Sequence, residues 1–250
     1  MISFIICSID NARFQQVAAN IAAVMGLEPF EIIRIADALS LAEGYNRGID
    51  ASKGEQIVFC HDDIEILAKD FPARLARHFE TFDVVGVAGT TRVIAGAWIA
   101  AGPPYIFGQV AHVNRQQNCF DICLYGVNGR AKGNIQAIDG LFMACKRIVV
   151  RKVLFDAAAF DHFHLYDLDF SFRAHLAGFT VAVANDLLIV HASGGSFDQR
   201  WQVYKQRFED KHRAHLQVSR PVQWQMGFAR VATRQEVAAI MDAPWFNDPQ

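Results

Sequence analysis

Three adjacent polar residues with the chemistry of a metal site follow an apolar run early in the chain. The segment EQIVFCHDDIEI (residues 55–66) begins as a buried strand and continues into His61, Asp62 and Asp63. Carboxylates at the end of a buried strand are unfavourable unless a cation neutralises them. A divalent metal ion that carries a phosphate is a suitable cation. A polar turn is the other interpretation, but paired acids in a pocket favour a site.

A second set of acids lies in the segment YDLDFSFR (residues 166–173), which has the pattern of a helix start. Asp169 and Arg173 are four residues apart, which is the spacing of an ion pair on one helix face. Asp167 points to a different face, because residues two apart on a helix do not share one. We expect Asp167 to face a cleft, while Asp169 and Arg173 brace the helix. Alternatively, both acids only favour the positive end of the helix dipole.

The elements that must position these residues alternate between strand and helix. Apolar runs at residues 2–8, 30–35, 55–60 and 84–88 predict four strands, and helical spacing between them predicts three helices. This order predicts a mostly parallel sheet covered by helices on both faces, with ligands at the carboxyl ends of its strands. Residues 90–136 lose this pattern and are predicted to form an irregular binding loop or lid.

Periodicity resumes in the second half of the chain. An apolar run around residues 138–145 predicts a strand, and residues 167–175 predict a helix that ends before Gly178. Two further apolar runs, at residues 180–184 and 187–190, predict strands. From Asp198 onward, the pattern predicts one or two amphipathic helices.

Size, charge and cysteine content limit the classes of protein that this sequence can encode. The chain has 250 residues, of which 52% are hydrophobic and 20% charged, so it can bury a sizeable core as one large domain or two small ones. A formal net charge of -2 indicates no nucleic-acid partner. The five cysteines lie in apolar runs or in one weak C-x-x-x-C pattern, which indicates reduced thiols.

No segment has the pattern of a leader or of a membrane span. The N-terminal run MISFIICSID lacks a basic region, and the weakly polar stretch at residues 93–107 is interrupted by glycines and prolines. We therefore expect a cytoplasmic chain without a transmembrane segment, or one that associates peripherally with the inner face of a membrane.

Several motifs, taken in order, resemble the glycosyltransferases of the GT-A fold, in particular the large family-2-like group. SFIICSIDN (residues 3–11) resembles the opening strand and nucleotide loop, and residues 40–66 resemble the segment that leads into the metal motif. IDGLFMACKR (residues 138–147) resembles the acceptor-side strand, and YDLDFSFRAHLAGF (residues 166–179) resembles the family's acidic helix start. IVHASGGSF (residues 189–197) resembles the closing histidine segment, so the resemblance covers most of the chain.

This resemblance implies the fold, the domains and the reaction. The fold is a Rossmann-like, mixed and mostly parallel sheet flanked by helices. The domain spans residues 1–197, with a nucleotide-binding half (1–90) and an acceptor half (91–197), and residues 198–250 form a helical extension. The implied reaction moves a sugar from a UDP-, GDP- or dTDP-sugar to a hydroxyl of a glycan, a lipid-linked molecule or a protein. It would depend on Mn²⁺ or Mg²⁺ and invert the anomeric carbon by direct displacement.

The resemblance also implies roles for individual residues. Asp167 matches the catalytic base, and Asp63 and His191 match the metal ligands, although His191 could equally be a core histidine. Donor positions, several of which would also suit ordinary caps, turns or exposed helix polarity, are Ser8, Asp10, Asp37, Asn46, Arg47, His61 and Asp62. Acceptor positions are Trp98, Asp139, Gly140 and Tyr166.

The sequence departs from the family's pattern at two of these positions. His61 stands where the metal motif usually begins with an acid, and Tyr166 stands where a glutamate usually precedes the catalytic aspartate. Both departures keep open an inactive nucleotide-sugar or glycan-binding protein. A nucleotidyltransferase would share the sheet and the acids, but it usually carries a Gly-rich basic loop that ICSIDNARF does not resemble.

Overall fold

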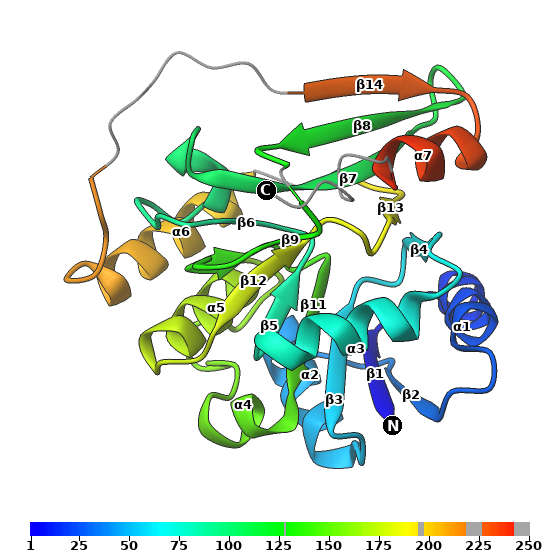
Figure 1. The fold of residues 1–250 in the computed structure, drawn as a ribbon. Coiled ribbons are helices and arrows are strands. Elements are labelled where there is room, and N and C mark those ends of the chain that lie inside the picture. The colour runs from blue at the N-terminus through cyan, green and yellow to red at the C-terminus, as the bar shows by residue number, and fades with distance from the viewer. Residues whose placement is uncertain (128, 195–197, 219–226, 243–250) are drawn as a thin grey trace.

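A seven-stranded mixed sheet forms the centre of the molecule in the computed structural model, which describes residues 1–127, 129–194, 198–218 and 227–242 (Figure 1). Its order is β2-β1-β3-β11-β5-β12-β9. β1 pairs in parallel with both β2 and β3, so the carboxyl ends of these three strands lie at one edge. The strands are β1 (Ile2–Cys7), β2 (Phe30–Ile35), β3 (Gln56–Cys60), β5 (Val84–Gly86), β9 (Ala131–Lys132), β11 (Phe142–Lys146) and β12 (Val181–Ala184).

Helices cover both faces of this sheet, as the sequence predicts (Figure 1). Successive side chains of a strand point to opposite faces, so Phe4 and Ile6 join one core while Ile5 joins the other. The first core packs against α1 (Asn11–Met25) and α3 (Phe71–Thr81). The second core packs against α2 (Leu41–Ala51), α4 (Arg147–Lys152) and α5 (Tyr166–Leu176).

The first two helices begin where the sequence places polar caps. Asp10 accepts hydrogen bonds from the backbone N–H groups of Ala12 and Arg13, and Ser40 accepts one from Glu43. Gly48 lets α2 approach the sheet, because a Cβ there would lie 2.1 Å from Ile5 Cγ2.

The central part of residues 90–136 is a β-hairpin, so the prediction of an irregular loop is wrong there. β7 (Ile106–Asn114) and β8 (Cys119–Tyr125) pair antiparallel through seven residue pairs from Gly108↔Tyr125 to Asn114↔Cys119. Their polar and glycine residues hid the strand pattern, since strand propensity depends on the partners that the fold supplies. Residues 91–105, before the hairpin, contain the short 3₁₀ helix η1 (Trp98–Ala101) and no strand.

The hairpin belongs to a second sheet, which brings the chain's second half beside the metal motif. The order of this sheet is β10-β6-β7-β13-β4, with β8 on the other side of β7. The predicted strand at residues 84–88 divides at Val87, so that β5 stays in the first sheet and β6 enters the second. The additional strands are β4 (Ile64–Ile66), β6 (Ala88–Thr90), β10 (Ala137–Ile138) and β13 (Ile189–His191).

The predicted helical extension contains two helices and also a strand. α6 (Gln199–His212) packs on the second core, and α7 (Arg234–Met241) packs on the first. Between them, β14 (Gly227–Val231) pairs antiparallel with β8, as the orange strand at the top of Figure 1 shows. Residues 195–197 of the closing motif, and residues 219–226 and 243–250 of the extension, lie outside the described residues. Among the described residues, no helix is long and apolar enough to cross a membrane.

A buried charge cluster joins α6 to α5. The predicted pair of Asp169 with Arg173 forms, with Nε 2.7 Å from the carboxylate, but Asp169 has no exposed surface and also binds Lys211 and His212 of α6 at 2.7 and 2.8 Å. Burial alone would raise the pKa of Asp169, yet the bond from His212 and the charges of Arg173 and Lys211 lower it. The cluster therefore holds the start of α5 against the C-terminal helix.

Candidate active site

Three potential metal ligands converge at the edge between the two sheets. His61 directly follows β3, Asp63 precedes β4, and His191 ends β13. Because β13 pairs with β4 in the register His191↔Ile64, the histidine comes to lie beside the metal motif. Nε2 of His191 is 3.3 Å from Nδ1 of His61 and 3.2 Å from Oδ1 of Asp63. The three ligand atoms lie within 4.8 Å of one another.

The donor set fits a divalent metal ion. Two imidazole nitrogens face each other, and a ring nitrogen that does not carry a proton is a metal ligand. Burial and the neighbouring His191 lower the pKa of His61, so the neutral ring predominates at pH 7. Burial would raise the pKa of Asp63, but the contacts with His191 and Ser193 hold it well below its usual range. Asp63 is therefore an anion, and the residues present suit a cation.

Tyr166 lies against the metal ligands. Its hydroxyl is 3.1 Å from Nε2 of His61 and donates to the carbonyl of Gly140 at 3.5 Å. The side chain is 3% exposed, and its ring packs 5.6 Å from that of Tyr45. The resemblance implied an acceptor contact for Tyr166, but its hydroxyl is engaged with groups of the protein itself.

A further acidic group of the site, Asp167, lies at the start of α5. Its Oδ2 accepts a hydrogen bond from the backbone N–H of Gly140 at 2.7 Å. Burial, followed by the negative charge of Asp139, raises the pKa of Asp167 from 3.8 to about 7. Gly140 has no room for a side chain, because a Cβ would lie 2.5 Å from Tyr166 Oη and 2.7 Å from Asp167 Cβ. The loop between β10 and β11, which carries residues 139 and 140, therefore approaches the start of α5 closely.

Asp139 and Trp98 are hydrogen-bonded to each other next to Asp167. Trp98 Nε1 donates to Asp139 Oδ2 at 2.7 Å, and the backbone N–H of Leu141 donates to Oδ1 at 2.9 Å. The Trp98 ring packs edge-on against Tyr125, with the ring centroids 5.3 Å apart. The four residues that the resemblance assigns to the acceptor therefore lie next to one another, although they come from three segments of the chain.

Most of the residues predicted to bind the donor lie near the carboxyl ends of the first strands, whereas Asn46 is bonded to another loop. Ser8 donates to Asp62 Oδ2 at 2.6 Å, which joins the end of β1 to the metal motif. Asp37, which follows β2, pairs with Arg47 at 2.7 Å. Asp10 caps α1, and its carboxylate remains half-exposed. Asn46, by contrast, uses its amide on the backbone N–H and carbonyl of Phe155 at 3.0 and 2.9 Å, so it holds a loop in place.

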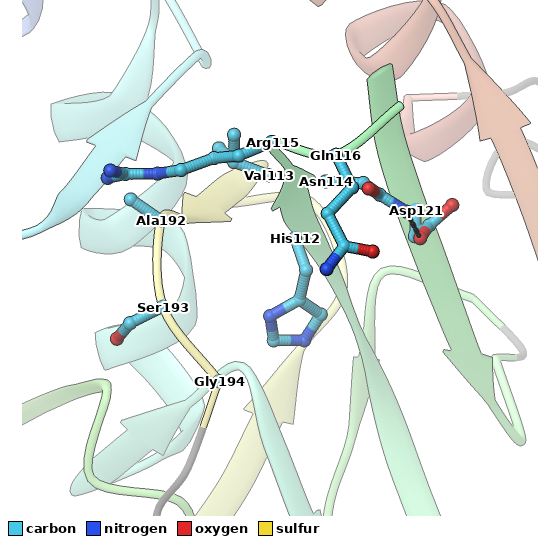
Figure 2. A pocket seen from close by; sticks show the side chains of 9 residues that line it. All are labelled: His112, Val113, Asn114, Arg115, Gln116, Asp121, Ala192, Ser193 and Gly194. Atoms are coloured by element: carbon cyan, nitrogen blue, oxygen red, sulfur yellow. Dashed lines mark hydrogen bonds between the residues drawn. The ribbon is translucent and has the colours of Figure 1, made fainter. Parts of the chain in front are cut away.

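A cavity of about 420 Å³ lies beside the metal ligands, between the end of β7 and the segment after His191 (Figure 2). His112 and Asn114 project into it from β7, opposite Ser193. Asn114 also donates to Asp121 of β8 at 2.8 Å. Sequence reasoning missed these residues because it placed them in an irregular loop. Their spacing of two, with His112 and Asn114 on one face of a strand, was the available signal.

A two-sheet α/β fold with imidazole, carboxylate and amide groups at strand ends is the arrangement that the resemblance to the GT-A glycosyltransferases implies. Residues 3–215 match the Glycosyltransferase like family, and the chain belongs to this family. The predicted family, fold and enzyme class are therefore confirmed.

A solved structure shares the fold at low sequence identity. The mannosyltransferase PcManGT from Pyrobaculum calidifontis, solved in complex with GDP-Man and Mn²⁺, is 13% identical, with a TM-score of 0.52 over 85% of this chain and 64% of that chain. A protein from STIV is 11% identical, with a TM-score of 0.43 over 79% of this chain and 96% of that chain. No curated protein matches the sequence significantly.

Proposed function

We propose that this glycosyltransferase moves a sugar from a nucleoside diphosphate sugar to a hydroxyl acceptor with a divalent metal ion, and that it inverts the anomeric carbon. One observation carries the proposal: a metal-ligand cluster and a carboxylate with a pKa of about 7 are joined by a continuous chain of contacts through His61, Tyr166, Gly140 and Asp167. A general base works best when its pKa is close to the operating pH.

Each part of the site has a separate task in this reaction. Asp63 and His191 would hold the metal ion, which supplies positive charge for the departing diphosphate when bound. Ser8, Asp37, Arg47 and Asp62 lie near the carboxyl ends of the first strands, where nucleotides bind in such sheets. The cavity lined by His112, Asn114 and Ser193 has groups that hydrogen-bond sugar hydroxyls, and we assign it to a sugar ring.

The chemical step is a direct displacement. Asp167 takes the proton of the acceptor hydroxyl, while the acceptor oxygen attacks the anomeric carbon from the face opposite the diphosphate. The bond between that carbon and the diphosphate oxygen breaks as the new glycosidic bond forms. The N–H of Gly140 aims the carboxylate, and the bond from Trp98 to Asp139 keeps a second negative charge nearby.

Binding and product analysis test this function. GDP-mannose is the first donor to examine, because PcManGT was solved with GDP-Man, followed by UDP- and dTDP-sugars. We expect a donor to raise the thermal unfolding temperature only when Mn²⁺ or Mg²⁺ is present, since ligands of the folded state stabilise it. Asp63→Ala should remove the metal-dependent part and keep the fold, whereas Asp210→Ala, in an exposed pair with Arg213, should change nothing.

The anomeric configuration of the product, read by NMR, tests the inversion. A product with the donor's configuration would contradict direct displacement. Absence of metal-dependent stabilisation with every donor would contradict the proposed function as a whole. Donor binding without transfer to any acceptor would instead favour a nucleotide-sugar-binding protein.

A further inference from the structure

The two positions at which the sequence departs from its family's acidic pattern touch each other. His61 replaces the first acid of the metal motif, and Tyr166 replaces the glutamate before Asp167. They are 105 residues apart in the sequence, yet His61 Nε2 and Tyr166 Oη are 3.1 Å apart. An acid at both positions would place two like charges at this distance, whereas a histidine and a tyrosine can share a hydrogen bond.

The contacts of Tyr166 determine which nitrogen of His61 carries the proton. The Tyr166 hydroxyl donates to the carbonyl of Gly140, so its oxygen remains free to accept from Nε2–H of His61. Nδ1 of His61 is then the unprotonated nitrogen. This nitrogen lies in the ligand cluster, 3.3 Å from Nε2 of His191. Metal-ligating histidines commonly donate their other ring N–H in this way, which fixes the tautomer and orientation.

The same contacts determine the chemical character of the ligand set. The cluster offers two imidazole nitrogens and one carboxylate, where an acidic motif would offer more oxygen and more negative charge. Mg²⁺ prefers hard oxygen ligands and water, whereas imidazole suits transition metals, whose affinity for nitrogen sites increases from Mn²⁺ to Co²⁺ and Ni²⁺. Compared with an acidic motif, the smaller negative charge and the imidazole nitrogens both lower the affinity of the site for Mg²⁺.

We propose that His61 is a third metal ligand, that Tyr166 is its positioning residue, and that the pair makes the site select transition-metal ions over Mg²⁺. This inference rests on the proposed function, because it concerns the ion that accompanies the donor's diphosphate. According to this inference, His61 and Tyr166 together change the ion that the site prefers. A purely structural role for the pair would instead affect the stability of the fold without distinguishing one ion from another.

Titration calorimetry with the full chain and GDP as the probe tests the inference. We expect MnCl₂ and CoCl₂ to bind the GDP-loaded protein at least about 10-fold more tightly than MgCl₂. His61→Asp should narrow this ratio by strengthening Mg²⁺ binding. Tyr166→Phe, which removes only the hydroxyl, should weaken Mn²⁺ binding by about 10- to 100-fold and Mg²⁺ binding less, so that the ratio narrows. His215→Ala, at an exposed histidine of the C-terminal half, is the matched control.

A spectroscopic measurement distinguishes ligation from indirect effects. Electron spin-echo spectra of bound Mn²⁺ should show couplings from two imidazole nitrogens in the wild type and from one in His61→Asp. If His61→Asp fails to fold, His61→Asn offers a neutral oxygen near the position of Nδ1 and should lose the same coupling.

The outcomes separate this inference from the proposed function. Equal affinity of the wild type for Mn²⁺ and Mg²⁺, or an ion ratio that His61→Asp leaves unchanged, would overturn the inference while metal-dependent donor binding stands. A wild-type protein that binds none of the ions in the presence of GDP, but binds GDP alone, would overturn the metal-dependent function itself.

Discussion

Replacing Asp167 by asparagine tests the assignment of the general base. Asparagine has the shape of aspartate, and its side-chain oxygen can still accept the hydrogen bond from Gly140, which is 2.7 Å long in the wild type. The substitution removes the proton acceptor and little else. We therefore expect kcat to fall by about 10²-fold or more, while the affinity for donor and metal changes little.

The pH dependence of kcat in the wild-type enzyme is a second test of Asp167 as the general base. Burial and then Asp139 raise the pKa of Asp167 to about 7, and only the deprotonated form accepts a proton. About one-tenth of the molecules are in that form at pH 6 and about nine-tenths at pH 8, so kcat should rise roughly ninefold between them. Asp139→Asn removes the neighbouring negative charge, which should lower the pKa of Asp167 and move this rise to lower pH.

The contribution of Asp167 to the free energy of unfolding should fall as the pH rises, whereas kcat rises. The pKa of Asp167 is raised on folding, so its contribution to stability is fully present below pH 3.8 and is lost as the pH rises through about 7. That difference in pKa corresponds to about 4 kcal/mol, and solvent at the partly exposed carboxylate screens part of it. Above pH 8, Asp167→Asn should therefore be more stable than the wild type by about 1–2 kcal/mol.

Steady-state transfer assays from pH 5.5 to 8.5 and urea unfolding at pH 5 and pH 8 measure these effects. The base assignment requires loss of activity together with a gain in stability at the higher pH. An Asp167→Asn enzyme with near wild-type kcat would refute it. A loss of activity accompanied by lower stability at pH 8 would show that the carboxylate is structural.

Other expectations follow from individual contacts. Asp169→Asn should lower the free energy of unfolding by about 3–5 kcal/mol in urea titrations, because it removes the buried negative charge that Arg173, Lys211 and His212 share. Asp210→Asn, in an exposed pair, should stay within about 0.5 kcal/mol, and equal effects would contradict the burial argument. Gly140→Ala should reduce kcat by about 10-fold or more, because its Cβ would push Tyr166 and Asp167 away from the loop between β10 and β11. An unchanged kcat would show that the start of α5 can move freely. Asn114→Ala should raise KM for a sugar substrate and leave Mn²⁺ affinity unaltered, and an unaltered KM for donor and acceptor would remove the cavity from the sugar-binding space.

Local sequence patterns determined most of the first sheet and the helices that cover it. Runs of apolar residues and polar caps such as Asp10 and Ser40 act within a few residues, so they can be recognised without the fold. The carboxyl ends of parallel strands lie at the same end of the sheet, which is why Asp62 and Asp63 could be expected in a candidate site there. The order of the motifs along the sequence also indicated the family.

Tertiary structure alone decided the second sheet and the contacts within the site. β7 contains Gly108, Gln109, His112 and Asn114, and it is a strand because β6, β8 and β13 supply its hydrogen-bond partners. Asp169 has the spacing of a surface pair, but α6 covers it. His61 and Tyr166 are separated by about a hundred residues, so only the close approach of β3, the loop at Gly140 and the start of α5 brings them together. Such contacts arise from packing over long sequence distances, and no local pattern encodes them.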